Sequence, residues 1–129
     1  CISPWVDMEL TGRSYDDRAE ADPMVSREGI QEMVRHYMGD ADLRAPHASP
    51  VHGDLRGLPP LLIQVGASET LLDDSQRFAE RARKAGVDVT VDVYPDMQHV
   101  FHFLVGVAPE ADDAIGKLAS WVRPKLGLG

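Results

Sequence analysis

Two stretches in the middle of the chain have hydrophobic patterns typical of β-strands. Residues 61–65, LLIQV, form a nearly continuous apolar run between a Pro-Pro pair and Gly66, which predicts a strand buried on both faces of a parallel sheet. Over residues 87–93, Val alternates with Asp and Thr, and this period of two predicts a strand with one solvated face near a sheet edge. Apolar residues around Ile2 predict a further strand, and we expect all three to lie parallel in one sheet.

Three other segments have the period of amphipathic helices. The first runs from Ser26, a suitable N-cap, to Met38, and Gly39 ends it. The second covers residues 72–85, with Asp residues in its first turn and Arg and Lys in its last, as the helix dipole favours. The third covers residues 109–122 and begins with Pro. The expected apolar faces are Ile30, Met33, Val34, Tyr37 and Met38 in the first helix, and Ala111, Ala114, Ile115, Leu118 and Val122 in the third.

The order of these elements indicates the fold class. Strands that alternate with helices predict an α/β fold with parallel strands and flanking helices, in three layers. Right-handed crossovers then place the carboxyl ends of the strands along one edge of the sheet, where a functional site is expected.

Two connections complete the chain. Residues 8–22 are polar and acid-rich and are expected to form a mobile loop. Residues 40–57 form a long irregular connection of the kind that shapes binding sites.

Composition narrows the function classes. With 129 residues, 43% of them hydrophobic, the chain can build one globular core. A net charge of −8 argues against a nucleic-acid partner, and the longest apolar runs are too short to span a membrane. The single cysteine, Cys1, excludes an intramolecular disulfide and fits a cytoplasmic location. The chain does not begin with Met, and we expect residues 1–129 to be a single partial domain.

Two residues with complementary chemistry follow the two central strands. Glu69 comes shortly after residues 61–65, and His99 follows residues 87–93. Since the carboxyl ends of parallel strands share an edge, we expect the carboxylate to face the Nδ1 side of the imidazole. Such a carboxylate fixes the tautomer of the ring and stabilises its cationic form, so the pair would supply two of the three members of a hydrolytic triad.

Several motifs together resemble one enzyme family. SPW near the start, ASPVHGDLRGLPPLLIQVG in the middle and ETLLDDSQRFAERARKAGVDVTVDVYPDMQHVF are similar to the carboxyl-terminal half of an α/β-hydrolase of the hormone-sensitive-lipase-like (family IV) esterase branch, in a bacterial, actinobacterial-type form. The resemblance implies a carboxylic ester hydrolase, an esterase or lipase, that acts on a small acyl ester. The family's acid and histidine match Glu69 and His99, which occur in the family's order and 30 residues apart.

The chain departs from the family pattern at two positions. The family more often has Asp where this chain has Glu69, and commonly has Gly where this chain has Asp96. Asp73 and Asp74 are rival acids, but the first turn of a helix gives them a sufficient structural role, so Glu69 is preferred.

The nucleophile of such a triad does not occur in these residues. No serine lies in a G-x-S-x-G string, and the HGG-type oxyanion motif is also absent. We therefore expect the amino-terminal half of the same enzyme to supply both, and the 129 residues by themselves not to hydrolyse esters. The alternative function is a non-catalytic α/β binding or dimerisation module, with a homodimer formed through the Val87–Val93 edge. A G-x-S-x-G string upstream of Cys1 would distinguish the two.

Other sites are less favoured by the sequence. His99 and His102 form an HxxH pair, but no further ligand has a suitable spacing, so no metal site is expected, and His36, His47 and His52 are expected to be solvated. No G-x-G-x-x-G string occurs, and no cofactor is expected. Residues that could line an acyl pocket, or else belong to the core, are Trp5, Met24, Val25, Phe101, Phe103 and Leu104. We also expect an exposed apolar sheet edge or face.

Overall fold

The structure is a computed structural model that describes residues 1–128. Its helices and strands, in chain order, are α1 (Ser14–Asp17), α2 (Arg27–Met38), β1 (Leu61–Gly66), α3 (Leu72–Lys84), β2 (Val89–Tyr94) and α4 (Pro109–Val122). Short 3₁₀ turns lie at η1 (Pro50–His52), η2 (Phe101–Leu104) and η3 (Pro124–Leu126).

The two central strands pair in parallel, as predicted. Their register runs from Leu61 opposite Val89 to Gly66 opposite Tyr94. β2 begins at Val89 instead of at position 87 because the amide of residue 87 donates to the carbonyl of Ala82 at the end of α3.

The segment around Ile2 lies on the other side of β1, but the expected third strand is reduced to one parallel bridge between Ile2 and Gln64. Ser3 has a positive φ of 44°, and Pro4 has no amide hydrogen to donate. The backbone therefore leaves the extended path directly after the bridge.

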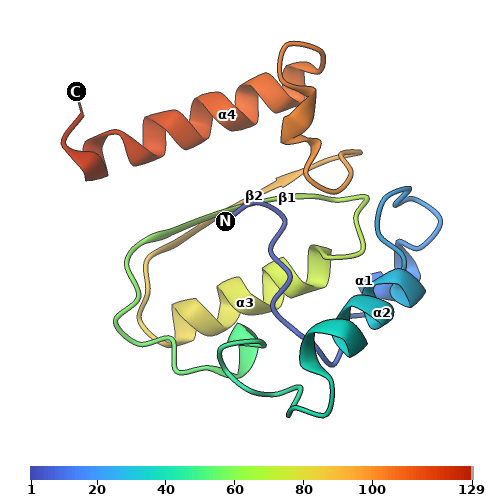
Figure 1. Ribbon diagram of the computed structural model, residues 1–129. Helices are drawn as coiled ribbons and strands as arrows, with labels where there is room; N and C mark the ends of the chain where they lie inside the picture. Colours follow the sequence, from blue (N-terminus) through green and yellow to red (C-terminus); the bar gives the residue numbers. More distant parts are fainter. Residues whose placement is uncertain (129) are drawn as a thin grey trace.

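Helices cover both faces of the strand pair, with α3 on one side and α4 on the other (Figure 1). On the α3 side, Phe78 and Ala82 pack in one apolar cluster with Ile63 of β1. On the α4 side, Ala111 and Ala114 pack with the aromatic rings of residues 94 and 101. This three-layer arrangement explains the continuous apolar run of β1, because both faces of that strand are buried.

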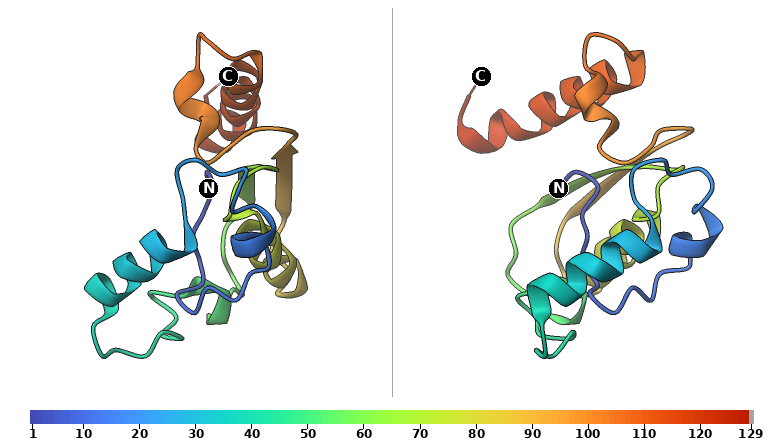
Figure 2. Two further views of the ribbon diagram at one scale, coloured as in Figure 1. Left: turned by 90° about the vertical axis from the view of Figure 1, so that its right-hand side faces the viewer. Right: turned by 45° about the vertical axis from the view of Figure 1, so that its right-hand side comes forward.

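α2 has the predicted N-cap, since the Ser26 hydroxyl accepts a hydrogen bond from the amide of Gly29. The helix lies on the α3 side of the strands, away from α4 (Figure 2). Its buried residues are Ile30, Val34 and Met38, whereas Met33 and Tyr37 are 61% and 71% exposed. The apolar face was therefore predicted too wide, because α2 packs against α1 and loop residues and not against the sheet.

Residues 8–22 correct another prediction, because they are not a plain loop. They contain α1, and the Tyr15 side chain is completely buried. The carboxylate of Asp73, at the start of α3, accepts hydrogen bonds from the amides of Arg13 and Ser14. The residues that fix this segment lie about 60 positions away in the chain, so local sequence could not reveal them.

α4 begins with Pro109 as predicted, and its buried residues are Ala111 and Ala114. Ile115 is 36% exposed, so this face too is narrower than the pattern suggested. Within residues 1–128, none of the helices is both long enough and apolar enough to cross a membrane.

Candidate active site

The site is built by two loops that leave the carboxyl ends of β1 and β2. The amide of Ala67 donates to the Tyr94 carbonyl (2.9 Å), and the amide of Ser68 donates to the Met97 carbonyl (3.0 Å). Gly66 makes this contact possible, because a Cβ at that position would lie 2.1 Å from the Met97 oxygen. Backbone contacts thus hold the two loops together, and each loop carries one of the candidate residues.

Glu69 and His99 lie side by side, as the sequence predicts. Glu69 Oε2 is 3.8 Å from His99 Nδ1. The carboxylate is fully buried, while the imidazole side chain is 20% exposed. Because Nδ1 faces the acid, Nε2 on the far side of the ring is left for a reacting group. The separation exceeds a hydrogen bond, so a shift of about 1 Å would be needed to form one.

A third residue, which sequence reasoning missed, also contacts the acid. The buried Ser3 hydroxyl donates a hydrogen bond to Glu69 Oε2 (2.8 Å). The same hydroxyl accepts a hydrogen bond from the amide of Val100, directly after His99 (3.2 Å). No spacing rule joins positions so far apart in sequence, so the only available signal was the SPW string itself.

The rival acids Asp73 and Asp74 are occupied elsewhere. Asp74 Oδ2 accepts hydrogen bonds from the amides of Val6 and Asp7, and Asp73 holds the start of α1 as described above. Burial raises the pKa of Asp74 to about 6, and the neighbouring Asp7 carboxylate acts in the same direction. Both carboxylates make structural contacts, but the amides that they hold belong to a distant segment and not, as the capping role would require, to their own helix.

A cavity of about 300 Å³ opens beside His99. Its lining residues are Ser3, Trp5, Met24, Val25, Ser26, Gly29, Ile30, Met33, Leu71 and His99. Asp22 shapes one wall, because its Oδ1 accepts from the amides of Met24 and Val25 while its Oδ2 accepts from the amide of Thr70, next to Glu69. The arrangement is a mostly apolar pocket with an imidazole at its side.

Residues 1–103 match a family model described as the alpha/beta hydrolase fold. The chain belongs to this family. The predicted α/β-hydrolase fold is thereby confirmed.

Similar proteins include esterases from bacteria. The chain is 42% identical to an acetyl-hydrolase of Streptomyces hygroscopicus over 129 residues, which are 100% of this chain and 43% of that protein. It is 39% identical to an esterase of Acinetobacter venetianus over 122 residues, 93% of this chain and 40% of that protein. A crystal structure of an esterase from the bacterial hormone-sensitive lipase family matches with a TM-score of 0.94 and 44% identity, over 96% of this chain and 42% of that one. These similarities confirm the predicted branch, and the chain spans about two fifths of the length of these relatives.

The departure from the family pattern at Asp96 has a structural reason. Asp96 has a positive φ of 59°, in the left-handed region that glycine adopts most easily. Asp is among the few other residues that tolerate this conformation. The hydrolase loop before His99 therefore keeps the backbone shape that glycine would favour.

Three of the residues proposed for an acyl pocket do not line the cavity beside His99. Phe101 is buried in the core, where its ring lies 4.9 Å from that of Tyr94. Phe103 is 84% exposed, and Leu104 also lies at the surface. These three residues belong to the turn η2, whereas Trp5, Met24 and Val25 line the cavity.

The other histidines differ in their environments. His102 is buried, its Nε2 lies 3.1 Å from Gln64 Oε1, and burial lowers its pKa. It forms no possible metal-ligand group with His99 among residues 1–128. His36 and His47 are exposed as expected.

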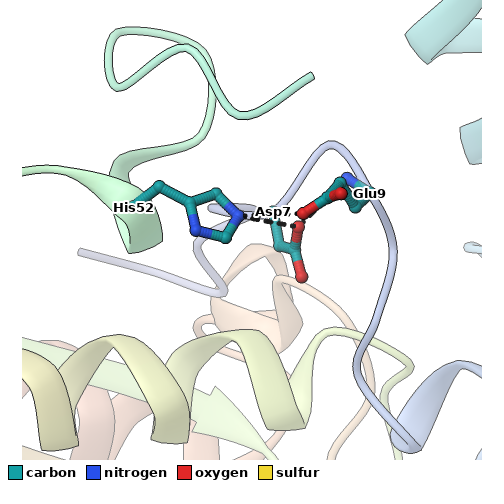
Figure 3. Close-up of side chains that lie close together, drawn as sticks. All are labelled: Asp7, Glu9 and His52. Carbon is teal, nitrogen blue, oxygen red and sulfur yellow. Dashed lines mark hydrogen bonds and ion pairs between the residues drawn. The ribbon is translucent and has the colours of Figure 1, made fainter. Parts of the chain in front are cut away.

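His52 was wrongly predicted to be solvated, because its ring is only partly exposed and its Nε2 faces two carboxylates, those of Asp7 and Glu9 (Figure 3). Nε2 is 3.1 Å from Glu9 Oε2 and 3.9 Å from Asp7 Oδ1. Each of the three residues offers one atom that could bind a metal ion, and these atoms lie within 4.8 Å of one another. Arg77 already pairs with Asp7 at 2.9 Å, and Arg44 lies 3.8 Å from Glu9. The positive charges of two guanidinium groups therefore compensate the negative charges of the two carboxylates. The cluster can stabilise the fold without a metal ion.

Proposed function

We propose that the whole protein is a carboxylic ester hydrolase in which Glu69 and His99 are the acid and the histidine of a Ser-His-acid triad. The observation that carries this proposal is the 3.8 Å approach of Glu69 Oε2 to His99 Nδ1, at the edge where both parallel strands end. The serine nucleophile and the oxyanion hole are proposed to come from a part of the protein outside these 129 residues, which contain no G-x-S-x-G string.

We propose one role for each of the two residues. His99 Nε2 takes the proton of the serine hydroxyl as its oxygen attacks the acyl carbon, and then returns this proton to the leaving alkoxide. A water molecule attacks the acyl-enzyme in the same way, which releases the acid and restores the serine. Glu69 keeps the Nδ1 hydrogen on its own side of the ring and stabilises the imidazolium that forms in both steps.

The proposed substrate is a small acyl ester. The cavity of about 300 Å³ beside His99 is lined mostly by apolar side chains, including Trp5, Val25 and Met33, and it has room for a short chain. The name of the Streptomyces relative, an acetyl-hydrolase, points in the same direction.

Hydrolysis of p-nitrophenyl esters by the whole protein tests this function. We expect the highest kcat/KM with acetate or butyrate and a steep fall towards long chains. We also expect inactivation by phenylmethylsulfonyl fluoride, because an activated serine attacks its sulfur, displaces fluoride and is left sulfonylated. The 129-residue chain alone is the matched control and should show no turnover. Ester hydrolysis that resists the sulfonyl fluoride, or no hydrolysis of any ester in the series, would contradict the proposal.

A second, non-catalytic role is proposed for the Val87–Val93 edge as a homodimer interface. Within residues 1–128, β2 has a strand partner on one side only, and Val93 on it is 40% exposed. A second copy of the chain could pair with this free edge. Sedimentation velocity should show a dimer that Val93→Lys weakens, and an unchanged dimer would place the interface elsewhere.

The cytoplasm is the proposed compartment, on the basis of the single cysteine. Cys1 is an exposed free thiol, which a reducing environment tolerates best. Cell fractionation with an antibody against the chain would test this, and recovery outside the cytoplasm would overturn it.

A further inference from the structure

Ser3 joins the two halves of the candidate site through one hydroxyl group. Glu69 lies on the loop after β1, and Val100 lies next to His99 on the loop after β2. The Ser3 hydroxyl bonds both, although Ser3 is 66 positions from Glu69 and 97 from Val100 in the chain. Its backbone amide also donates to the Gln64 carbonyl of β1 at 2.8 Å, so the residue is anchored to the sheet.

The chemistry of the partners determines the direction of both hydrogen bonds. An ionised carboxylate can only accept, and a backbone amide can only donate. The Ser3 oxygen therefore accepts from Val100, and its hydrogen points to Glu69 Oε2. This is the same carboxylate oxygen that faces His99 Nδ1.

The backbone supports a specific role for this contact. Ser3 and Val100 both have positive φ, 44° and 47°, and such values are uncommon for serine and a clear outlier for the β-branched valine. Residues stay in such conformations only where the surroundings fix them, and they cluster at functional sites. Here the two residues bond to each other directly beside the acid and the histidine.

We propose that Ser3 is a positioning residue that orients the Glu69 carboxylate towards His99 and stabilises its charged form in a fully buried place. This inference rests on the function proposed above and adds to it a residue outside the triad. Glu69 Oε1 has no hydrogen-bond partner among the described residues, so Oε2 is the oxygen by which the carboxylate is held. Without the hydroxyl, the acid would lose its one side-chain donor and its link to the His99 loop.

A double-mutant cycle in the whole enzyme tests this role. Ser3→Ala should lower kcat for p-nitrophenyl acetate roughly tenfold or more with little change in KM. Although Ser3 lines the cavity, its hydroxyl is already hydrogen-bonded to Glu69 and to the Val100 amide and is not free to bond the substrate. In a Glu69→Gln background the same substitution should change kcat less than about twofold, because there is no carboxylate left to position. A merely structural serine would cause the same loss in both backgrounds.

Two further variants separate positioning from folding. Ser3→Gly removes the hydroxyl while the positive φ favours glycine, so it should fold well and lose activity like Ser3→Ala. Ser49→Ala is the matched control: its buried hydroxyl also bridges two segments, from the Met8 amide to the Leu43 carbonyl, away from Glu69. Ser49→Ala should lower the melting temperature and leave kcat unchanged. For every variant, the concentration of active sites is measured by stoichiometric titration with the sulfonyl fluoride, and kcat is calculated per active site.

The outcomes distinguish this inference from the proposed function. If Glu69→Gln alone leaves kcat unchanged, then Glu69 is not the acid and the proposed function fails. If Glu69→Gln lowers kcat but Ser3→Ala and Ser3→Gly do not, or if their losses persist in the Glu69→Gln background, then the function stands and the role of Ser3 is overturned. A loss that disappears when rates are counted per active site would also overturn it.

Discussion

Gly66 and the carbonyl of Met97 approach each other so closely that a Cβ on Gly66 would lie 2.1 Å from the Met97 oxygen. This contact joins the loop that carries Glu69 to the loop that carries His99. The distance between these two side chains therefore depends on a position that has no side chain of its own.

Gly66→Ala should be strongly destabilising, because the new methyl group meets backbone atoms that cannot rotate away. We expect the free energy of unfolding to fall by about 3 kcal/mol, as for severe overpacking, and the proposed esterase activity of the whole protein to fall as well. Gly116→Ala is the control, since a Cβ there meets open space in the middle of α4 and should be neutral or stabilising. Urea denaturation of both variants measures the difference, and equal stabilities would contradict the role of Gly66.

Asp74 should make the folded protein less stable as the pH rises. Its pKa is raised to about 6 in the folded state, so the folded protein binds a proton more tightly than the unfolded chain does. Between about pH 4 and pH 7, wild-type stability should fall relative to Asp74→Asn, by at most roughly 3 kcal/mol. The asparagine carbonyl can still accept from the Val6 and Asp7 amides.

Urea denaturation at several pH values measures this difference. Asp17→Asn, at an exposed position on α1, should show no such trend. The prediction is contradicted if the free energy of unfolding of wild type, relative to that of Asp74→Asn, stays constant or increases as the pH rises. Ionisation of Asp74 would then not destabilise the folded protein.

Met33 should limit the length of the acyl chain. It lines the cavity beside His99 but is 61% exposed, so Met33→Ala should enlarge the cavity with little effect on folding. The ratio of kcat/KM for hexanoate to that for acetate should rise several-fold. Tyr37→Ala on the same helix is the control, because Tyr37 is exposed and does not line the cavity. If both variants have the same hexanoate-to-acetate ratio of kcat/KM, Met33 does not limit the acyl chain.

The sequence predicted those features that depend on local pattern and on strand order. The parallel pairing of β1 and β2 and the neighbouring positions of Glu69 and His99 follow from hydrophobic periodicity and from the geometry of a crossover. The roles of Ser3 and of the Asp73 carboxylate could not be predicted, because each acts on residues about 60 or more positions away. His52 was misjudged for a similar reason, since its partners Asp7 and Glu9 lie more than 40 positions earlier in the chain.

The most direct test of the central claim is the kcat of His99→Ala in the whole enzyme, with p-nitrophenyl acetate as substrate. If His99 is the base that Glu69 orients, kcat should fall on the order of 10⁴-fold or more, while the melting temperature stays close to that of wild type. His36→Ala, which removes an exposed imidazole on α2, should retain full activity. Near-normal turnover by a folded His99→Ala protein would contradict the account and leave His99 with a structural role.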